Sequence, residues 1–158
     1  MRIGKVAVQE MLPILPALGQ TYYRNKLEFS FSSKRWLTPQ ELADGQSNEQ
    51  NVLGFHRAGA FDKVVNIEHC FLQSDPCNVI RNRMRSIAIA QELSFYDARI
   101  NEGFLRNVII RVTTLEEVMV IIAFQQDAPQ QFRPFLDELL AGFPQITTLL
   151  YCINSKVN

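Results

Sequence analysis

Two runs rich in valine and isoleucine lie close together in the last third of the 158-residue chain. They cover residues 105–113 and 118–125, and only residues 114–117 separate them. β-Branched residues favour strands, and a short connection between two such runs is typical of a β-hairpin. The sequence therefore predicts a hairpin near the centre of a sheet, and the other segments have to pack around it.

Two amphipathic helices are predicted, one on each side of this hairpin in the sequence. The first covers residues 75–93, with Asp75 as its N-cap and Pro76 at the first helical position. The second covers residues 130–143, and Pro134 blurs its start because proline is tolerated only in the first turn. Each helix carries one apolar stripe. The stripes contain Ile80, Met84, Ile87 and Ala88, and Phe132, Phe135, Leu136, Leu139, Leu140 and Phe143.

Further strands are expected at residues 63–67 and 146–153, so the order from residue 63 onward is β-α-β-β-α-β. This order predicts a ferredoxin-like core, an α+β fold with an antiparallel sheet and two helices on one face. Residues 27–32 and 52–57 are interpreted as earlier strands that extend the sheet or form a small β ribbon beside it. We expect one domain over residues 1–158, with residues 1–20 as a lead-in segment and residues 38–51 as a polar loop.

Composition excludes several classes of protein. Hydrophobic residues make up 47% and charged residues 20% of the chain, which favours a packed core over disorder. The formal net charge is zero, so there is no overall attraction to nucleic acid. An odd number of cysteines, three, without a secretory signal favours a reducing, cytoplasmic setting. No run of about 18 uncharged apolar residues predicts a membrane span.

Motifs of common active sites are absent from the sequence. There is no GxGxxG, GxxxxGK[ST] or GxSxG motif, and His56 and His69 do not form HExxH. Cys70 and Cys77 have six residues between them, which matches no common zinc or iron–sulfur motif. Cys152 is expected in a core strand. We therefore predict no catalytic residue in this chain.

Cations and aromatic rings alternate around the first predicted strand. Tyr22, Tyr23, Arg24 and Lys26 come just before or at its start, and Phe29 follows within it. This mixture suits RNA, because guanidinium groups bind phosphate and rings stack on unpaired bases. The alternative is an exposed strand edge whose aromatic rings belong to the core.

Four other arginines lie on predicted elements. Arg81 and Arg85 are one turn apart on the first helix, where like charges repel unless they share an anion. The alternative is a solvated helix face. Arg106 and Arg111 lie on the predicted hairpin, and their odd separation predicts opposite faces.

Three segments, YRNKLEFSFS, LGFHRAGAFDKVVNIEHC and GFLRNVIIR, follow one another in this chain. In this order and spacing they resemble the bacterial 5-methyluridine RNA methyltransferases that act on 23S rRNA. The resemblance covers roughly residues 20–158. Members of that family combine an N-terminal RNA-binding barrel, a cysteine cluster that often holds a [4Fe–4S] centre, a central α+β domain and a catalytic domain that binds S-adenosylmethionine (SAM). The resemblance implies that this chain is the central, non-catalytic domain.

The family resemblance also implies residue roles. Tyr23 and Arg24 match the Tyr-Arg pair at the start of the family's central domain, where the arginine faces RNA. Lys26 matches a further basic position, and Arg57 and Lys63 complete the predicted RNA-binding set. The expected partners are rRNA and the enzyme's own catalytic and N-terminal domains, without a membrane.

Cys70 matches the remote ligand of the [4Fe–4S] cluster, whose other three ligands would precede residue 1. Gly54, Phe55 and Gly59 match the strand-turn-strand that presents this ligand. The resemblance implies that SAM is bound by the missing catalytic domain, so that this fragment holds no cofactor and performs no methyl transfer alone.

Two other functions remain open at this point. A free-standing ferredoxin-like ligand-binding module predicts an apolar pocket. A purely structural spacer predicts a neutral surface around Arg24 and Lys26.

Overall fold

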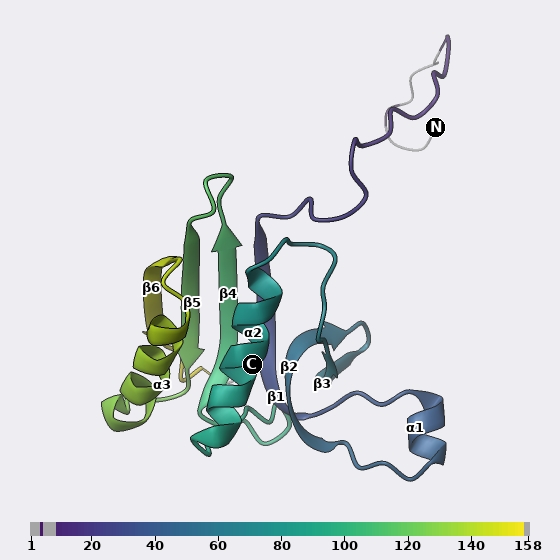
Figure 1. Cartoon of the computed structure of the whole chain (residues 1–158). Coiled ribbons are helices and arrows are strands. Elements are labelled where there is room, and N and C mark those ends of the chain that lie inside the picture. The colour runs from purple at the N-terminus through teal and green to yellow at the C-terminus, as the bar shows by residue number, and fades with distance from the viewer. Residues whose placement is uncertain (1–3, 5–8, 157–158) are drawn as a thin grey trace.

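The computed structural model describes Gly4 and residues 9–156. In chain order its elements are β1 (Lys26–Lys34), α1 (Pro39–Ala43), β2 (Glu49–Arg57), β3 (Ala60–Asn66), α2 (Cys77–Ala90), β4 (Leu105–Val112), β5 (Val118–Phe124), α3 (Pro129–Gly142) and β6 (Ile146–Ile153). All six strands form one sheet, in the order β3-β2-β1-β4-β5-β6. Helices α2 and α3 lie on one face of this sheet (Figure 1). The predicted α+β class, with two helices on one face, is confirmed.

The predicted hairpin is confirmed as β4 and β5, which pair antiparallel near the centre of the sheet. Strand β1 pairs antiparallel with the other side of β4. Leu27, Phe29 and Phe31 of β1 are at most 4% exposed and belong to the core beneath the helices. The intervening Lys26 and Glu28 are exposed on the opposite face. Strand β1 is therefore a core strand near the centre of the sheet, whereas the sequence predicts a sheet extension or a small β ribbon beside it.

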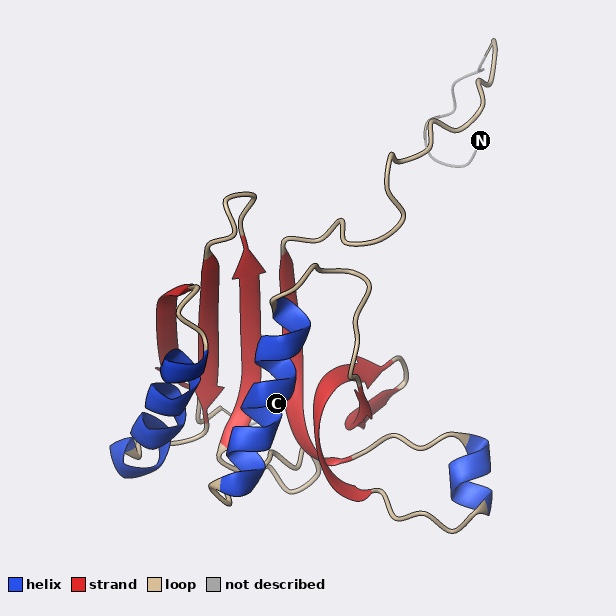
Figure 2. Ribbon diagram, viewed as in Figure 1, coloured by secondary structure: helices blue, strands red, loops and turns tan. Residues whose placement is uncertain are grey.

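Two features of the predicted ferredoxin-like core are wrong. Strand β6 runs parallel to β5, so the sheet, whose strands are red in Figure 2, is mixed and not antiparallel throughout. These two strands are joined through α3, and a helical crossover of this kind allows neighbouring strands to run parallel. A ferredoxin-like order would also place β3 between β5 and β6. Instead, a tight turn with Gly59 at φ +80° pairs β3 with β2, which leaves β3 at the edge.

Several element boundaries also differ from the prediction. Pro76, and not Asp75, is the N-cap of α2. Helix α3 begins at Pro129, which places Pro134 inside the helix. The polar loop after β1 contains the short helix α1, where Thr38 and Glu41 form a capping box.

Of the expected lead-in segment, residues 1–3 and 5–8 lie outside the described residues, and residues 9–25 form neither helix nor strand. Within the part of the chain that the structure describes, no helix is both long and apolar enough to cross a membrane.

Helix α3 is fixed to the sheet by aromatic packing. The ring of Phe124 on β5 lies 5.3 Å from Phe132 and 6.4 Å from Phe135 between centroids. Tyr151 of β6 lies 4.6 Å from Phe132 in the same way. These contacts help to bury Phe132, Phe135 and Leu139 of the predicted stripe, whereas Leu140 of the same stripe is 41% exposed.

Candidate nucleic-acid interface

A cleft forms where the chain enters β1. Residues 22–25 run beside the loop that leads from β3 to α2. The backbone N–H of Tyr22 donates to the carbonyl of Phe71 at 2.7 Å. The N–H of Arg24 donates to the carbonyl of Leu72 at 2.8 Å. These hydrogen bonds hold the segment against a part of the chain that is far away in sequence.

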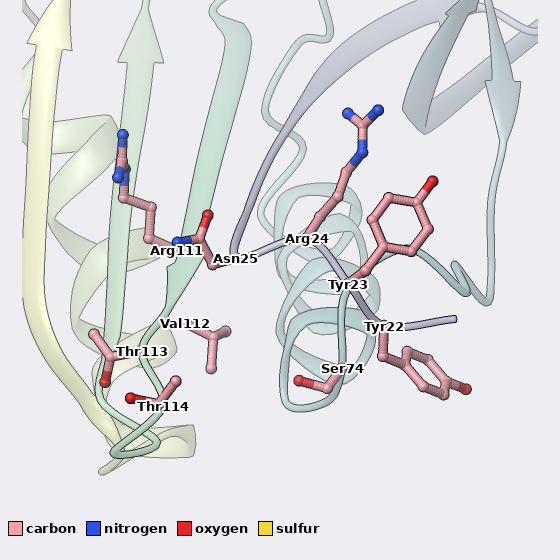
Figure 3. A pocket seen from close by; sticks show the side chains of 9 residues that line it. All are labelled: Tyr22, Tyr23, Arg24, Asn25, Ser74, Arg111, Val112, Thr113 and Thr114. Atoms are coloured by element: carbon pink, nitrogen blue, oxygen red, sulfur yellow. The ribbon is translucent and has the colours of Figure 1, made fainter. Parts of the chain in front are cut away.

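The cleft has a volume of about 530 Å³, and Figure 3 shows its side chains. Arg24 lies on one side of Asn25 and Arg111, from the end of β4, lies on the other. The ring of Tyr23 stands beside Arg24 and is 63% exposed. The lining residues are Tyr22, Tyr23, Arg24, Asn25, Ser74, Arg111, Val112, Thr113 and Thr114.

The chemistry of this lining is cationic and rich in hydrogen-bond donors. No aspartate or glutamate occurs among the described residues that line the cleft. Two guanidinium groups without a lining carboxylate create a positive potential, and guanidinium binds phosphate oxygens well. The hydroxyl groups of Ser74, Thr113 and Thr114 can add neutral hydrogen bonds. The cleft is therefore suited to an anionic, hydrogen-bonding ligand.

Three aromatic side chains cluster next to the cleft. The ring centroids of His69 and Phe71 are 4.5 Å apart, and those of Tyr22 and Phe71 are 6.2 Å apart. The hydroxyl of Tyr22 lies 3.1 Å from Nε2 of His69. Phe71 remains 60% exposed and Tyr22 44% exposed. These rings are outside the core, so the alternative of core aromatics is wrong for Tyr22 and Tyr23.

The predicted RNA-binding residues fall into separate groups. Tyr23 and Arg24 line the cleft, and Lys26 is exposed at the start of β1 immediately after it. Arg57 and Lys63 lie on the β2–β3 hairpin and are not part of the cleft lining. Sequence reasoning did not include Arg111 in the set, because only the pairing of β1 with β4 brings it to the cleft.

The two hairpin cations lie in different local surroundings. The guanidinium carbon of Arg57 lies 5.0 Å from the centroid of the Trp36 ring. Lys63 lines a separate cavity of about 280 Å³ in which Arg99 pairs with Asp62. The hydrogen bond from Arg99 holds the pKa of Asp62 below its usual range. This second surface is a mixed network of charges, unlike the cleft.

The three cysteines occupy different environments. Cys70 is buried, and Asn78 binds both its N–H (2.8 Å) and its carbonyl (3.3 Å). Burial raises the pKa of the Cys77 thiol to about 12, so that this thiol stays protonated near neutral pH. Cys152 is exposed on β6, and its expected place in the core is wrong because β6 is the edge strand of the sheet.

The described residues offer few ligands for a metal ion. Within residues 9–156, no group of three or more His, Cys, Asp or Glu side chains could hold a metal ion. Cys70 is well ordered by Asn78 but is a single thiol. The described residues therefore do not complete a metal site or a cluster site by themselves.

Two buried arginines were not foreseen. Arg106 is 2% exposed, and its guanidinium carbon lies 4.3 Å from the Tyr96 ring centroid. Its Nη1 also donates to the carbonyls of Asn154 (2.8 Å) and Lys156 (2.6 Å). Arg81 on α2 is wholly buried, so the expectation of a solvated helix face is wrong for this residue.

Comparison with known proteins places these features in context. No family model matches the chain. A protein of Bacteroides thetaiotaomicron named uncharacterized RNA methyltransferase is 46% identical over 161 aligned positions, which cover 99% of this chain and 36% of that protein. The chain is homologous to a segment of bacterial RNA methyltransferases. A Porphyromonas gingivalis protein of the same name is 43% identical, over 99% of this chain and 35% of its own length.

The chain thus spans about a third of the length of these RNA methyltransferases. Among solved structures, it resembles the Pyrococcus abyssi tRNA (uracil-54, C5)-methyltransferase in complex with S-adenosyl-L-homocysteine. The TM-score is 0.63 and the identity 17%, over 92% of this chain and 30% of that enzyme. At this identity the likeness shows a shared fold.

Proposed function

We propose that this chain is the RNA-contacting, non-catalytic central domain of a cytoplasmic, SAM-dependent RNA (uracil-5-)-methyltransferase that modifies rRNA. The homologous RNA methyltransferases, of which the chain spans about a third, support an RNA substrate. The shared fold with a segment of a uracil-C5 methyltransferase in complex with S-adenosyl-L-homocysteine supports the reaction class and the methyl donor.

The observation that carries this proposal is the cleft between Arg24 and Arg111. It combines two guanidinium groups, an exposed tyrosine ring and no carboxylate among its described lining residues. Guanidinium groups bind backbone phosphates, and exposed rings stack on unpaired bases. The adjacent exposed rings of Tyr22 and Phe71 extend the surface on which a base can stack. In this role the domain holds RNA while another domain performs the reaction.

The cleft also separates the proposal from the two other functions that the sequence left open. A free-standing module for a small ligand predicts an apolar pocket, whereas this cleft has arginine and hydroxyl groups in its lining. A structural spacer requires a neutral surface, whereas Arg24 and Arg111 line this cleft and Lys26 is exposed beside it. The lining of the cleft therefore favours RNA contact over both other functions.

The reaction itself needs groups that we assign to the rest of the enzyme. Methylation at uracil C5 requires a thiolate that adds to C6, a base that removes the C5 proton and a bound methyl donor. Cys70 and Cys77 are buried, and Cys77 is held protonated by its raised pKa. If the parent enzyme holds a [4Fe–4S] cluster, Cys70 is the ligand that this chain supplies.

RNA binding by the 158-residue chain tests the proposal. We expect Arg24→Ala and Arg111→Ala each to weaken binding of a uridine-containing rRNA fragment several-fold. Each should also lower the slope of log K against log salt by about 1, because one phosphate contact is lost. Arg133→Ala, which removes an exposed arginine on α3 outside the cleft, is the matched control. Wild-type affinity and salt slope in both cleft variants would overturn the proposal.

A further inference from the structure

Arg81 carries a positive charge in the interior without a carboxylate partner. Its side chain is fully buried on α2, and the guanidinium carbon lies 5.1 Å from the Phe29 ring centroid. Nη1 donates to Oδ1 of Asn78 and Nη2 to Oδ1 of Asn82, both at 3.0 Å. Nε has no hydrogen-bond partner among the described residues. The hydrogen bonds of this charge therefore go to neutral amides, and the carboxylate of Asp75 acts on it only from beyond ion-pair distance.

Such an arrangement is unfavourable unless an anion completes it. Burial lowers the pKa of Arg81, which shows that its charged form is poorly solvated here. Arginine nevertheless keeps its proton in proteins. A buried charge without a counter-ion destabilises a fold. Arg85, one helical turn further on, adds a second cation with the same sign.

Both arginines line one cavity between α2, the middle of β2 and the end of β3. Its volume is about 170 Å³, well above the roughly 10–15 Å³ that a cavity needs to hold one water molecule. The amide of Asn82 and the hydroxyl of Ser86 also line it, but the hydroxyl already donates to the carbonyl of Asn82 and one N–H of the amide to the carbonyl of Glu68. The full lining is Leu53, Asn66, Ile67, Glu68, Arg81, Asn82, Arg85 and Ser86.

Glu68 is the one acidic group in this lining, and it does not neutralise the site. Among the described residues, the ion pairs within 4.0 Å involve other side chains, and neither Arg81 nor Arg85 takes part in one. The Nε group of Arg85 instead donates to the backbone carbonyl of Asn51 at 2.8 Å. Two cations thus converge on a polar cavity without an internal counter-ion.

We propose that this cavity binds a phosphate group, held between the guanidinium groups of Arg81 and Arg85. A tetrahedral oxyanion offers acceptors to the Nε group of Arg81, which has no hydrogen-bond partner among the described residues, and to the terminal nitrogens of Arg85. The phosphate comes either from free inorganic phosphate or from an RNA backbone, and only the second source rests on the proposed function.

Thermal unfolding of the chain in sodium phosphate and in sodium chloride at matched ionic strength tests the site. We expect phosphate to raise the Tm by roughly 5–10 °C at a concentration about 100-fold above its Kd, because the ligand binds only the folded state. In Arg85→Gln this rise should disappear. Arg83→Gln is the matched control, since Arg83 is on the same helix but pairs with Glu138.

A second variant protects the test against failure to fold. Arg81→Met replaces the buried cation by an apolar side chain of similar length, and we expect it to fold without phosphate and to lose the phosphate response. Equal Tm values in phosphate and chloride for the wild type, or an undiminished phosphate response in Arg85→Gln, would overturn the site.

RNA binding distinguishes the two sources of phosphate. If the backbone is the source, Arg85→Gln weakens RNA binding several-fold and inorganic phosphate competes with RNA more strongly than chloride does. If Arg85→Gln loses the phosphate response but keeps wild-type RNA affinity, the site holds free phosphate. Wild-type RNA binding in both Arg24→Ala and Arg111→Ala would remove the proposed function and leave this site standing.

Discussion

Lys26 and Arg111 are directly opposite each other on the antiparallel strands β1 and β4. Both side chains are exposed, and both alternate with core residues that face the helices. Directly opposed side chains on a sheet are close neighbours, so two cations in this position repel each other. Together with Arg24, this pair concentrates positive charge at one corner of a chain whose formal net charge is zero.

Reversing one charge of this pair should change stability and RNA affinity in opposite directions. We expect Lys26→Glu to raise the free energy of unfolding by on the order of 0.5 kcal/mol at low salt, because repulsion becomes attraction at an exposed site. RNA affinity should fall at the same time. Urea unfolding and RNA titration measure the two effects. Arg133→Glu makes the same change in net charge on α3, and equal behaviour of the two variants would contradict the assignment.

Gly54 lies where β2 and β3 approach closely. A Cβ atom at this position would be 2.0 Å from the carbonyl oxygen of Val65, which is backbone and cannot move aside easily. We expect Gly54→Ala to lower the free energy of unfolding by about 3 kcal/mol. Gly142→Ala is the control, because no atom lies within 4 Å of the added Cβ. Equal stability of the two variants by urea unfolding would argue against this strand pairing.

The pairing of Asp62 with Arg99 predicts a pH dependence. Because the folded pKa of Asp62 is below that of the unfolded chain, the pair contributes stability above about pH 4, and this contribution is lost as the pH falls through the folded pKa. Asp62→Asn should therefore cost on the order of 1 kcal/mol near neutral pH, since Arg99 is largely exposed and solvent weakens the pair. The difference from wild type should shrink in acid. A difference that stays constant from neutral to acidic pH would show that the carboxylate is not the cause.

Thiol reactivity reports on the edge position of β6. Cys152 is exposed, whereas Cys70 and Cys77 are buried. We expect a thiol reagent such as dithionitrobenzoate to modify Cys152 in the folded chain and the other two thiols only after unfolding. Cys152→Ser should remove the fast phase. Rapid modification of more than one thiol in the native chain would contradict the described burial.

The periodic segments could be predicted from the sequence because their patterns are local. The β4–β5 hairpin, both long helices and β6 were expected within a few residues of where they lie. The partner of each strand was not predictable in the same way. Strand pairing depends on contacts between distant segments, such as Leu27 with Ile110, that local periodicity does not encode.

The arginines show a second limit of sequence reasoning. A register shift between Leu105 and Asn107 breaks the alternation of β4, so that Arg106 and Asn107 line the same cavity. Asn107 and Arg111 are an even number of residues apart after the shift, so their side chains lie on the same face of the sheet. Arg106 lies on that face too, and the expectation that Arg106 and Arg111 point to opposite faces is therefore wrong. Burial of Arg81 depends on Asn78 and Asn82, whose amides look like ordinary surface residues in the sequence.

The central place of β1 has a consequence for how the chain is made. Lys26 and its partner Arg111 are 85 residues apart in the sequence, the difference between their positions. At a synthesis rate of about 5–20 residues per second, β1 waits on the order of 4–17 s on the ribosome before β4 emerges. During that interval β1 can pair with β2 along one edge, but β4, its neighbour along the other edge, is still missing. The nascent chain therefore passes through a stage that exposes an unpaired strand edge.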